Sequence, residues 1–288
     1  METVISAAII GLGLGAQYVL LSLGFTLIYG ILGVINFAHG GFYMLGGYVA
    51  FAVVSKLGLP YPVAVVAATL FCGGLGAVFE LLVLERHIDD HLATMMLTMG
   101  LYLVMGTALV LVFGTEPVDF TSPVSGSWRS GRIYVPYANL VVLCCCLVAI
   151  GGVYLLLYKS TLGRSLRALA DDRPVATALG LPPRILFPVA FAISTGLAGF
   201  TGALVTPILS LNPHIGDSIL GVSFMIVILG GLGSVVGAAV AAFVVGLIEA
   251  YSSIYLGGSI GALTLFVVVL VTLAVRPTGL FGRQVRAA

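Results

Sequence analysis

The sequence contains a 53-residue stretch, from Thr3 to Ser55, without a single Asp, Glu, Lys or Arg. A transmembrane helix needs about 20 consecutive apolar residues, so this stretch is too long for one helix. Residues 36–41 (Asn-Phe-Ala-His-Gly-Gly) form a polar, glycine-rich interruption within it. We therefore expect one membrane helix before this interruption and a shorter one after it.

The composition extends this conclusion to the whole chain. Only 8% of the 288 residues are charged and 60% are hydrophobic, whereas a soluble domain carries about 25% charged residues. These values exclude a water-soluble globular fold, and they exclude a disordered chain because such chains are polar and charged. A formal net charge of +1 offers no basic surface for nucleic acid. The sequence predicts an all-α, polytopic membrane protein.

Further charge-poor segments mark additional spans. They cover residues 57–84, 92–114, 133–158, 185–216, 218–248 and 250–275. Glycines between residues 230 and 237 interrupt the segment 218–248, which is either one long tilted helix or two segments that meet at this break. We expect a single transmembrane domain over residues 1–288 with eight spans, or nine if the segment is broken, and with some segments broken or re-entrant.

Basic residues indicate the orientation. The connection 159–184 and the tail 276–288 carry eight of the twelve Lys and Arg residues, and cytoplasmic loops are rich in these residues. Both stretches should be cytoplasmic, which requires an even number of spans between them and favours nine spans. Eight spans would leave the tail on the wrong side unless one segment is re-entrant. Counting back from residue 159 places the N-terminus outside.

The connection 159–184 contains a short helix with well-defined ends. Asp172 is a good N-cap, Pro174 fits the first turn, and Gly180 suits the position just beyond the C-terminus. Such a two-turn helix, with small residues on its surface, is not stable alone in water and must dock on something. Docking on the protein's own membrane face and docking on a partner both remain open from these residues alone.

Few polar residues lie at membrane depth, and they are candidates for a substrate pathway because burying an unpaired polar group is costly. Asn36 and His39 lie at the first break, where the favoured role is to satisfy backbone groups of the interrupted helix. Glu80, Asp217 and Glu249 lie near span ends. For these acids a pore role and a position among the lipid headgroups both remain open.

No metal centre is expected. Cys72 and the run 144–146 lie in apolar stretches and are expected to be small buried residues. His87 and His91 are four residues apart with two aspartates between them, but a third converging ligand is not evident. A solvated connection between spans is the preferred interpretation of that segment.

Several motifs resemble those of a known family. Residues 164–180 resemble the coupling loop of ABC importer permeases, a variant of the EAA-type motif with Ala176, Ala178 and Gly180 in the expected order. Other stretches are similar to branched-chain amino-acid permeases of the LivH type: 36–48, 230–238 and 276–282. The sequence differs at Gly41, where that family frequently has an acidic residue, and at Gly47, where it usually has Ala.

The resemblance implies a permease subunit of an ATP-driven importer for branched-chain amino acids (leucine, isoleucine, valine) that works by alternating access. Its implied partners are a homologous second permease in a heterodimer, two ATP-binding cassette subunits and a periplasmic substrate-binding protein, in the bacterial inner membrane with a cytoplasmic C-terminus. The implied ATPase-coupling residues are Arg164, Arg167, Asp171, Asp172, Arg173, Ala176, Ala178, Leu179 and Gly180. The implied pathway residues are Asn36, His39, Gly40, Gly230, Gly231, Gly233 and Ser234.

In that arrangement the three arginines of the coupling loop would pair with acidic rims of the ATPase cleft. No cofactor is expected in this chain, because its only lysines, Lys56 and Lys159, are not preceded by the glycine of a Walker A motif. ATP and magnesium would be held by the partner subunits, so the chain itself is not expected to be an enzyme.

Alternative functions remain. Related permeases carry urea or short amides, and a stand-alone secondary transporter is a further possibility, although ion-coupled carriers usually need buried ionisable groups. An intramembrane serine protease using Ser194 or Ser234 with His214 is disfavoured, because the sequence has no Gly-x-Ser-x-Gly elbow.

Overall fold

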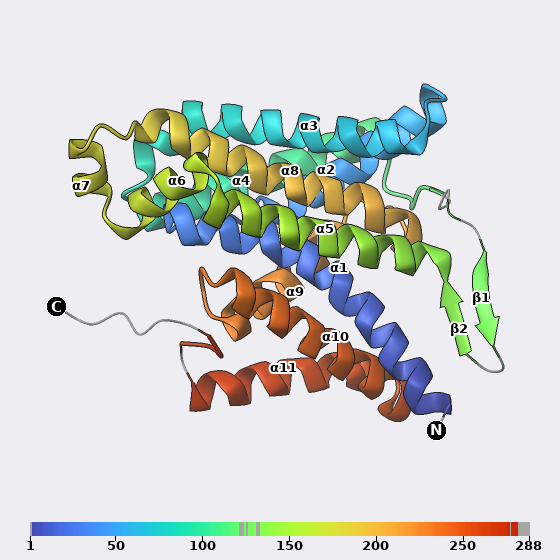
Figure 1. The fold of residues 1–288 in the computed structure, drawn as a ribbon. Helices are drawn as coiled ribbons and strands as arrows, with labels where there is room; N and C mark the ends of the chain where they lie inside the picture. Colours follow the sequence, from blue (N-terminus) through green and yellow to red (C-terminus); the bar gives the residue numbers. More distant parts are fainter. Residues whose placement is uncertain (1, 121–123, 125, 131–132, 277, 282–288) are drawn as a thin grey trace.

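The computed structural model describes residues 2–120, 124, 126–130, 133–276 and 278–281, which are mainly helical (Figure 1). The helices are α1 (Glu2–Leu32), α2 (His39–Phe51), α3 (Tyr61–Phe79), α4 (His91–Phe113), α5 (Tyr137–Lys159), α6 (Thr161–Asp171), α7 (Arg173–Ala178), α8 (Pro183–Leu209), α9 (Ile215–Gly230), α10 (Val235–Leu256) and α11 (Gly258–Val275). The chain continues as π-helix after α2 (Ala52–Lys56) and after α3 (Glu80–Leu84), and a 3-10 turn follows at Glu85–His87. Strands β1 (Ser127–Ser130) and β2 (Ile133–Pro136) form an antiparallel hairpin.

Within the described residues, six helices are long and apolar enough to cross a membrane. They are Val4–Leu32, Tyr61–His87, His91–Phe113, Tyr137–Lys159, Pro183–Leu209 and Val235–Leu256. This confirms an all-α polytopic membrane protein, apart from the small hairpin. Eight to nine full spans are not confirmed, because helices such as the 16-residue α9 are short. At 1.5 Å per residue α9 is about 24 Å long, less than the roughly 30 Å of a bilayer core.

The glycine-rich break predicted inside 218–248 is present, since α9 ends at Gly230 and α10 begins at Val235. The boundary predicted at Glu249 is wrong. Helix α10 continues through Glu249 to Leu256, because the hydroxyl of Tyr18 donates a 2.5 Å hydrogen bond to the Glu249 carboxylate and the acid is accommodated within the helix.

The span predicted to begin at residue 133 begins at Tyr137. Residues 133–136 pair with β1 instead, and Pro136, in an extended conformation, precedes the helix. The segment predicted over 185–216 also ends early. Helix α8 stops at Leu209, and Ser210, with φ of 113°, turns the chain towards α9.

Helices α6 and α7 lie at one end of the helical body, and the hairpin and the beginning of α1 lie at the other (Figure 1). The described part of the tail lies at the α6–α7 end. The backbone N–H of Leu280 donates to the carbonyl of Leu229 at 2.8 Å, and Phe281 lines a cavity together with Arg167 of α6. The connection 159–184 and this part of the tail therefore share one end of the molecule. Arg283 and Arg286 lie outside the described residues.

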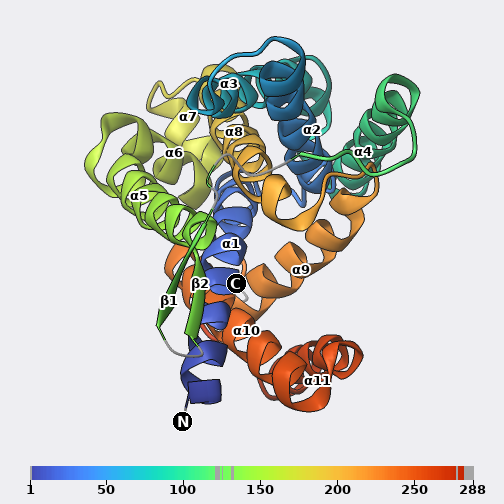
Figure 2. The same ribbon diagram turned by 90° about the vertical axis from the view of Figure 1, so that its right-hand side faces the viewer.

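Helix α1 lies at the centre, with α8 and α5 on one side and α10 on the other, while α11 is at the periphery (Figure 2). Helix α2 is enclosed by α3, α4, α8 and α9. Glycine makes this close packing possible. A Cβ atom added at Gly46 would lie 2.5 Å from the Cα of Gly199, and one added at Gly202 would collide with the carbonyl of Tyr43. The backbones of α2 and α8 thus touch directly.

Candidate functional site

The short helix predicted in the connection 159–184 is confirmed as α7. The side chain of Asp172 accepts a 3.0 Å hydrogen bond from the N–H of Val175. At the other end Gly180 has φ of +91°, and the N–H groups of Gly180 and Leu181 donate to the carbonyls of Thr177 and Ala176 at 2.9 and 3.1 Å. This pair of bonds is a Schellman motif. Both helix ends are therefore determined by local sequence.

The outward face of α7 differs from the small-residue surface expected from the sequence. Ala176 is 3% exposed and belongs to a core that includes Leu166 and Phe187. Val175 is 54% exposed and Leu179 80% exposed. The helix thus packs on the protein through Ala176 and presents an apolar surface formed by Val175, Ala178 and Leu179, which we call the α7 outer surface.

The coupling-loop arginines occupy three different environments. Arg173 forms a 2.8 Å ion pair with Asp89, and its guanidinium lies 5.3 Å from the centroid of the Phe187 ring. Arg167 lies over the ring of Tyr158 at 4.9 Å. Arg164 is exposed. The expectation that all three pair with a partner stays a prediction, and Arg173 also has a carboxylate partner in its own chain.

A second ion pair extends this contact. Arg184 Nε lies 2.8 Å from an oxygen of Glu85, so both ends of the α7 segment are bound to the connection between α3 and α4. These pairs were not predicted from the sequence, because the paired residues lie far apart in the chain, 84 positions in the case of Arg173 and Asp89. The two aspartates of the connection between α3 and α4 are engaged: Asp89 binds Arg173, and Asp90 accepts a 3.0 Å hydrogen bond from the N–H of Ala93 as the N-cap of α4.

The first predicted break is held together by its own polar groups. The side-chain oxygen of Asn36 accepts a 3.0 Å hydrogen bond from the N–H of Ala38. His39 Nε2 lies 2.9 Å from the carbonyl of Leu21, and its ring meets Phe25 edge to face at 5.5 Å. Both polar residues are buried. The favoured structural role of Asn36 and His39 at this break therefore agrees with the geometry.

Glycines in α2 bring neighbouring helices into contact with this break. A Cβ atom at Gly40 would collide with the carbonyl of Gly216 in α9. A Cβ atom at Gly41 would collide with the methyl of Met105 and would lie 3.0 Å from the ring of Tyr102. The position at which the resembling family frequently has an acidic residue is thus filled here by side chains of α4.

The second predicted break is a glycine turn closed by a cap. Gly231 and Gly233 have φ values of 99° and 80°, and the hydroxyl of Ser234 accepts a 3.1 Å hydrogen bond from the N–H of Gly237 as the N-cap of α10. Gly230 packs directly on the backbone of Gly237. The break also meets α1, because a Cβ atom at Gly233 would lie 3.3 Å from the Cα of Gly30.

The two breaks contact α1 at separate levels, the first beside Leu21 and Phe25 and the second beside Gly30. At 1.5 Å per residue these levels are about 8–14 Å apart. The structure therefore places the predicted pathway residues along one helix but not in one cluster.

Two of the carboxylates predicted near span ends have partners that the sequence did not reveal. The hydroxyl of Tyr102 donates to Asp217, and that of Tyr18 donates to Glu249. Asp217 and Glu249 line a common cavity of about 400 Å³ between α9, α10 and α11. Glu80 is fully buried in the π-helical turn after α3, and its carboxylate has no hydrogen-bond partner among the described residues.

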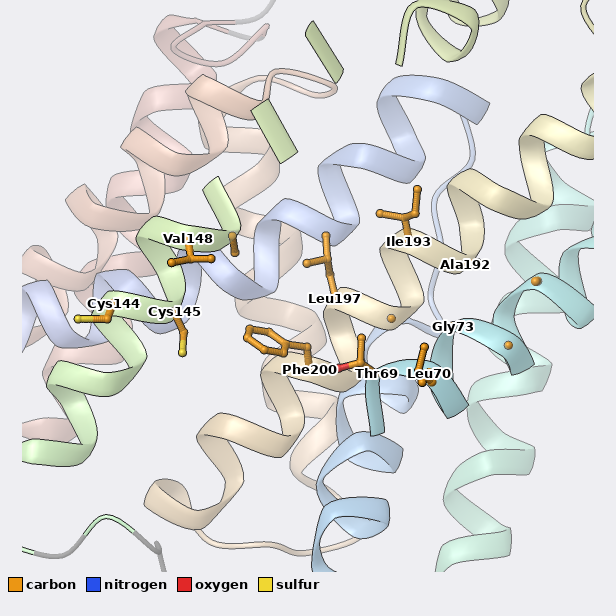
Figure 3. A pocket seen from close by; sticks show the side chains of 14 residues that line it. Thr69, Leu70, Gly73, Cys144, Cys145, Val148, Ala192, Ile193, Leu197 and Phe200 are labelled. Carbon is orange, nitrogen blue, oxygen red and sulfur yellow. The ribbon is translucent and has the colours of Figure 1, made fainter. Parts of the chain in front are cut away.

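A wide apolar groove of about 770 Å³ lies between α3, α5 and α8 (Figure 3). Its walls are apolar except for Thr69, whose hydroxyl is hydrogen-bonded to the carbonyl of Val65 at 2.8 Å. Cys145 lines it, and Cys144 is exposed, whereas Cys72 and Cys146 are buried. The expectation of four buried cysteines is therefore wrong for Cys144. A membrane helix has apolar residues both on its outer face and on its buried face, so an apolar stretch does not show which residues are buried.

The residues of the protease hypothesis do not meet. Ser194 donates to the carbonyl of Gly24 at 2.5 Å, and Ser234 caps α10. His214 precedes α9 and Ser234 follows it, so the 16-residue helix separates them by about 24 Å. These side chains cannot act as one catalytic group.

Comparison with known proteins identifies the family of this chain. The family described as "Branched-chain amino acid transport system / permease component" matches residues 7–276. The chain belongs to this family. It is 29% identical to the high-affinity branched-chain amino acid transport system permease protein LivH of Escherichia coli K12, over 95% of this chain and 94% of that protein.

Two other permeases of this family are also similar. BraD of Pseudomonas aeruginosa is 27% identical over 95% of this chain and 94% of its own length. LivM of Escherichia coli K12 is 28% identical over 75% of this chain and 57% of its own length. The prediction of a LivH-type permease is thus confirmed at the level of the family, whose members are transport components and not enzymes themselves.

Proposed function

We propose that this chain is a membrane-spanning subunit of an ATP-driven importer for leucine, isoleucine and valine. The observation that carries the proposal is the α7 outer surface: a capped helix presents exposed Val175 and Leu179 at one end of a permease body. An apolar surface of this kind, outside the apolar spans, suits a protein partner better than water. The similarity to LivH and BraD supports the substrate class.

The partners follow from the same arrangement. Two ATP-binding cassette subunits would hold ATP and magnesium, with one docked on each coupling segment. A homologous second permease of the LivM kind would complete the membrane part, and a periplasmic protein would deliver the substrate. The similarity of this chain to both LivH and LivM supports two related permeases in one heterodimeric complex.

The mechanism rests on rigid connections. Movement of a docked ATPase would push α7. The ion pair Arg173–Asp89 joins α7 to the connection between α3 and α4, and Arg184 at the start of α8 binds Glu85 of the same connection. Helix α6 joins α7 to α5. Because packed helices have discrete arrangements and do not deform continuously, such a push can switch the membrane part between two states. The glycine breaks at 36–41 and 230–234 remain the proposed pathway elements.

The proposed location of the protein is the bacterial inner membrane. The chain would cross this membrane nine times if the shorter helices α2, α9 and α11 also traverse it. We expect the residues of α6 and of the tail to be cytoplasmic, because they share one end of the molecule and are rich in arginine.

Single cysteines at Ser165 and Thr278 should be labelled by a membrane-impermeant maleimide only from the cytoplasmic side, and one at Trp128 only from outside. Opposite sidedness of Ser165 and Thr278 would contradict this topology.

The function is tested by reconstituting the chain with its second permease and two ATPase subunits in proteoliposomes, with the binding protein outside. We expect uptake of radiolabelled L-leucine that requires ATP. Uptake of urea or acetamide without leucine uptake would favour the amide alternative. Leucine uptake by the purified single chain without ATPase subunits would show a stand-alone transporter and contradict the proposal.

A further inference from the structure

A polar cavity of about 470 Å³ lies where α6 meets the link between α9 and α10. Its walls come from the ends of α1 and α5, from α6, from the turn 232–234 and from Phe281 of the tail. Small-molecule sites commonly have volumes of 300–1,000 Å³. The cavity is therefore large enough for a metabolite, and it is separate from the α7 outer surface.

Two opposite charges line this cavity. Arg167 and Asp171 are four residues apart on α6, so their side chains lie on the same face of the helix, with Cβ atoms roughly 5–6 Å apart. The Nε of Arg167 is buried and has no hydrogen-bond partner among the described residues. Tyr158 lies against the guanidinium, 4.9 Å from ring centroid to Cζ, and restricts its orientation. The guanidinium is thus held in place at the wall of the cavity.

The remaining walls are mainly apolar. The side chains of Tyr158, Leu232 and Phe281 line the cavity, and Gly30 and Gly233 contribute backbone only. Ser234 also lines it, with its hydroxyl accepting the N–H of Gly237. Leu232 is 40% exposed and Phe281 50% exposed, so both have surface left to cover. A planar guanidinium suits a carboxylate, a carboxylate suits an ammonium, and the apolar walls suit a hydrocarbon side chain.

We propose that this cavity binds a zwitterionic aliphatic amino acid, with Arg167 holding its carboxylate, Asp171 its ammonium, and Leu232 and Phe281 its side chain. The assignment of cytoplasmic access rests on the proposed function. Helix α6 is followed at once by Asp172 and α7, so a ligand that joins α6 to the α9–α10 link restrains the coupling segment. Accumulated amino acid on the cytoplasmic side therefore slows the ATP-driven cycle.

Binding is measured on the complete importer in lipid nanodiscs, without the substrate-binding protein, using L-leucine as the probe. Arg167→Gln and Asp171→Asn are each expected to weaken binding about tenfold or more, the effect of losing one charge-assisted hydrogen bond. Lys159→Gln is the matched control, because it removes one exposed positive charge at the same end of the protein without lining the cavity. It should leave leucine binding unchanged.

Two analogues test the ligand chemistry. Isovalerate lacks the ammonium and isoamylamine lacks the carboxylate, so both should bind about tenfold or more weakly than leucine. If isovalerate binds as tightly as leucine, the cavity is an anion site and the amino-acid assignment is wrong. Unchanged leucine binding in both Arg167→Gln and Asp171→Asn, or no leucine binding by the wild type, also overturns the proposal.

An uptake assay distinguishes failure of this proposal from failure of the proposed function. Leucine preloaded on the ATPase side should reduce ATP-driven uptake by the wild type and have a much smaller effect on Arg167→Gln. If the wild type takes up leucine but preloading affects wild type and variant equally, the regulatory consequence fails while the importer function stands. If the wild type takes up no leucine, the importer function fails, and the nanodisc titration still decides whether the cavity binds it.

Discussion

Gly46→Ala should abolish the folded membrane domain. The added methyl would lie 2.5 Å from the Cα and 2.7 Å from the carbonyl carbon of Gly199, both of them backbone atoms that cannot move by rotating a side chain. Overpacking of a core typically costs 1–3 kcal/mol and occasionally more, and we expect a cost of about 3 kcal/mol or more here because α2 and α8 must separate. The midpoint of thermal unfolding in detergent should fall by many degrees or the protein should fail to purify.

A matched substitution tests whether this effect is due to the contact. Gly74→Ala places the same methyl in α3, where no described heavy atom lies within 4 Å of the added Cβ. Alanine is about 0.5–1 kcal/mol better than glycine inside a helix, so this variant should keep or slightly raise the midpoint. Equal midpoints for Gly46→Ala and Gly74→Ala would contradict direct backbone contact between α2 and α8.

Leu179→Asp should abolish ATP-driven transport without unfolding the permease. Leu179 is 80% exposed, so its side chain adds little to the stability of this chain. Burying a leucine contributes about 1.5–3 kcal/mol, and placing a charge in the same interface adds a desolvation cost. We expect the complex with the ATPase subunits to weaken by at least about 30-fold and uptake in proteoliposomes to fall accordingly.

The controls for this variant use the same helix. Leu179→Met keeps an apolar side chain of similar volume and should retain transport. Ala176→Leu changes the buried side of α7 (Ala176 is 3% exposed) and should lower the unfolding midpoint, whereas Leu179→Asp should not. Full ATP-driven uptake by Leu179→Asp would refute docking of a partner on the α7 outer surface.

The helix ends and chain breaks were predictable from the sequence wherever the interacting groups are close neighbours in the chain. Asp172 caps α7 and Gly180 ends it, because capping bonds join residues two to five positions apart. The break between α9 and α10 was predictable for the same reason, since glycines with positive φ and the Ser234 cap are local features. A charge does not itself end a helix, so the boundary placed at Glu249 was wrong.

Contacts between distant segments were not predictable. Arg173 and Asp89 are 84 residues apart, and Tyr18 and Glu249 are 231 residues apart. The pattern of small residues in α7 indicated a contact surface but not its direction, because Ala176 packs equally well against its own chain or against a partner. Only the position of the surrounding helices shows that Ala176 is buried and that Leu179 faces outward.

The sequence by itself determined that the chain is an all-α membrane protein with a capped helix and two glycine breaks. These properties depend on composition and on neighbouring residues, and composition decides whether lipid or water can solvate the surface. The tertiary structure decided which helices are long enough to span and which arginines are already paired. In the tertiary structure Arg167, Asp171 and Phe281 also line one cavity. Such groupings depend on how the helices pack in three dimensions, and the spacing of residues along the sequence does not show this.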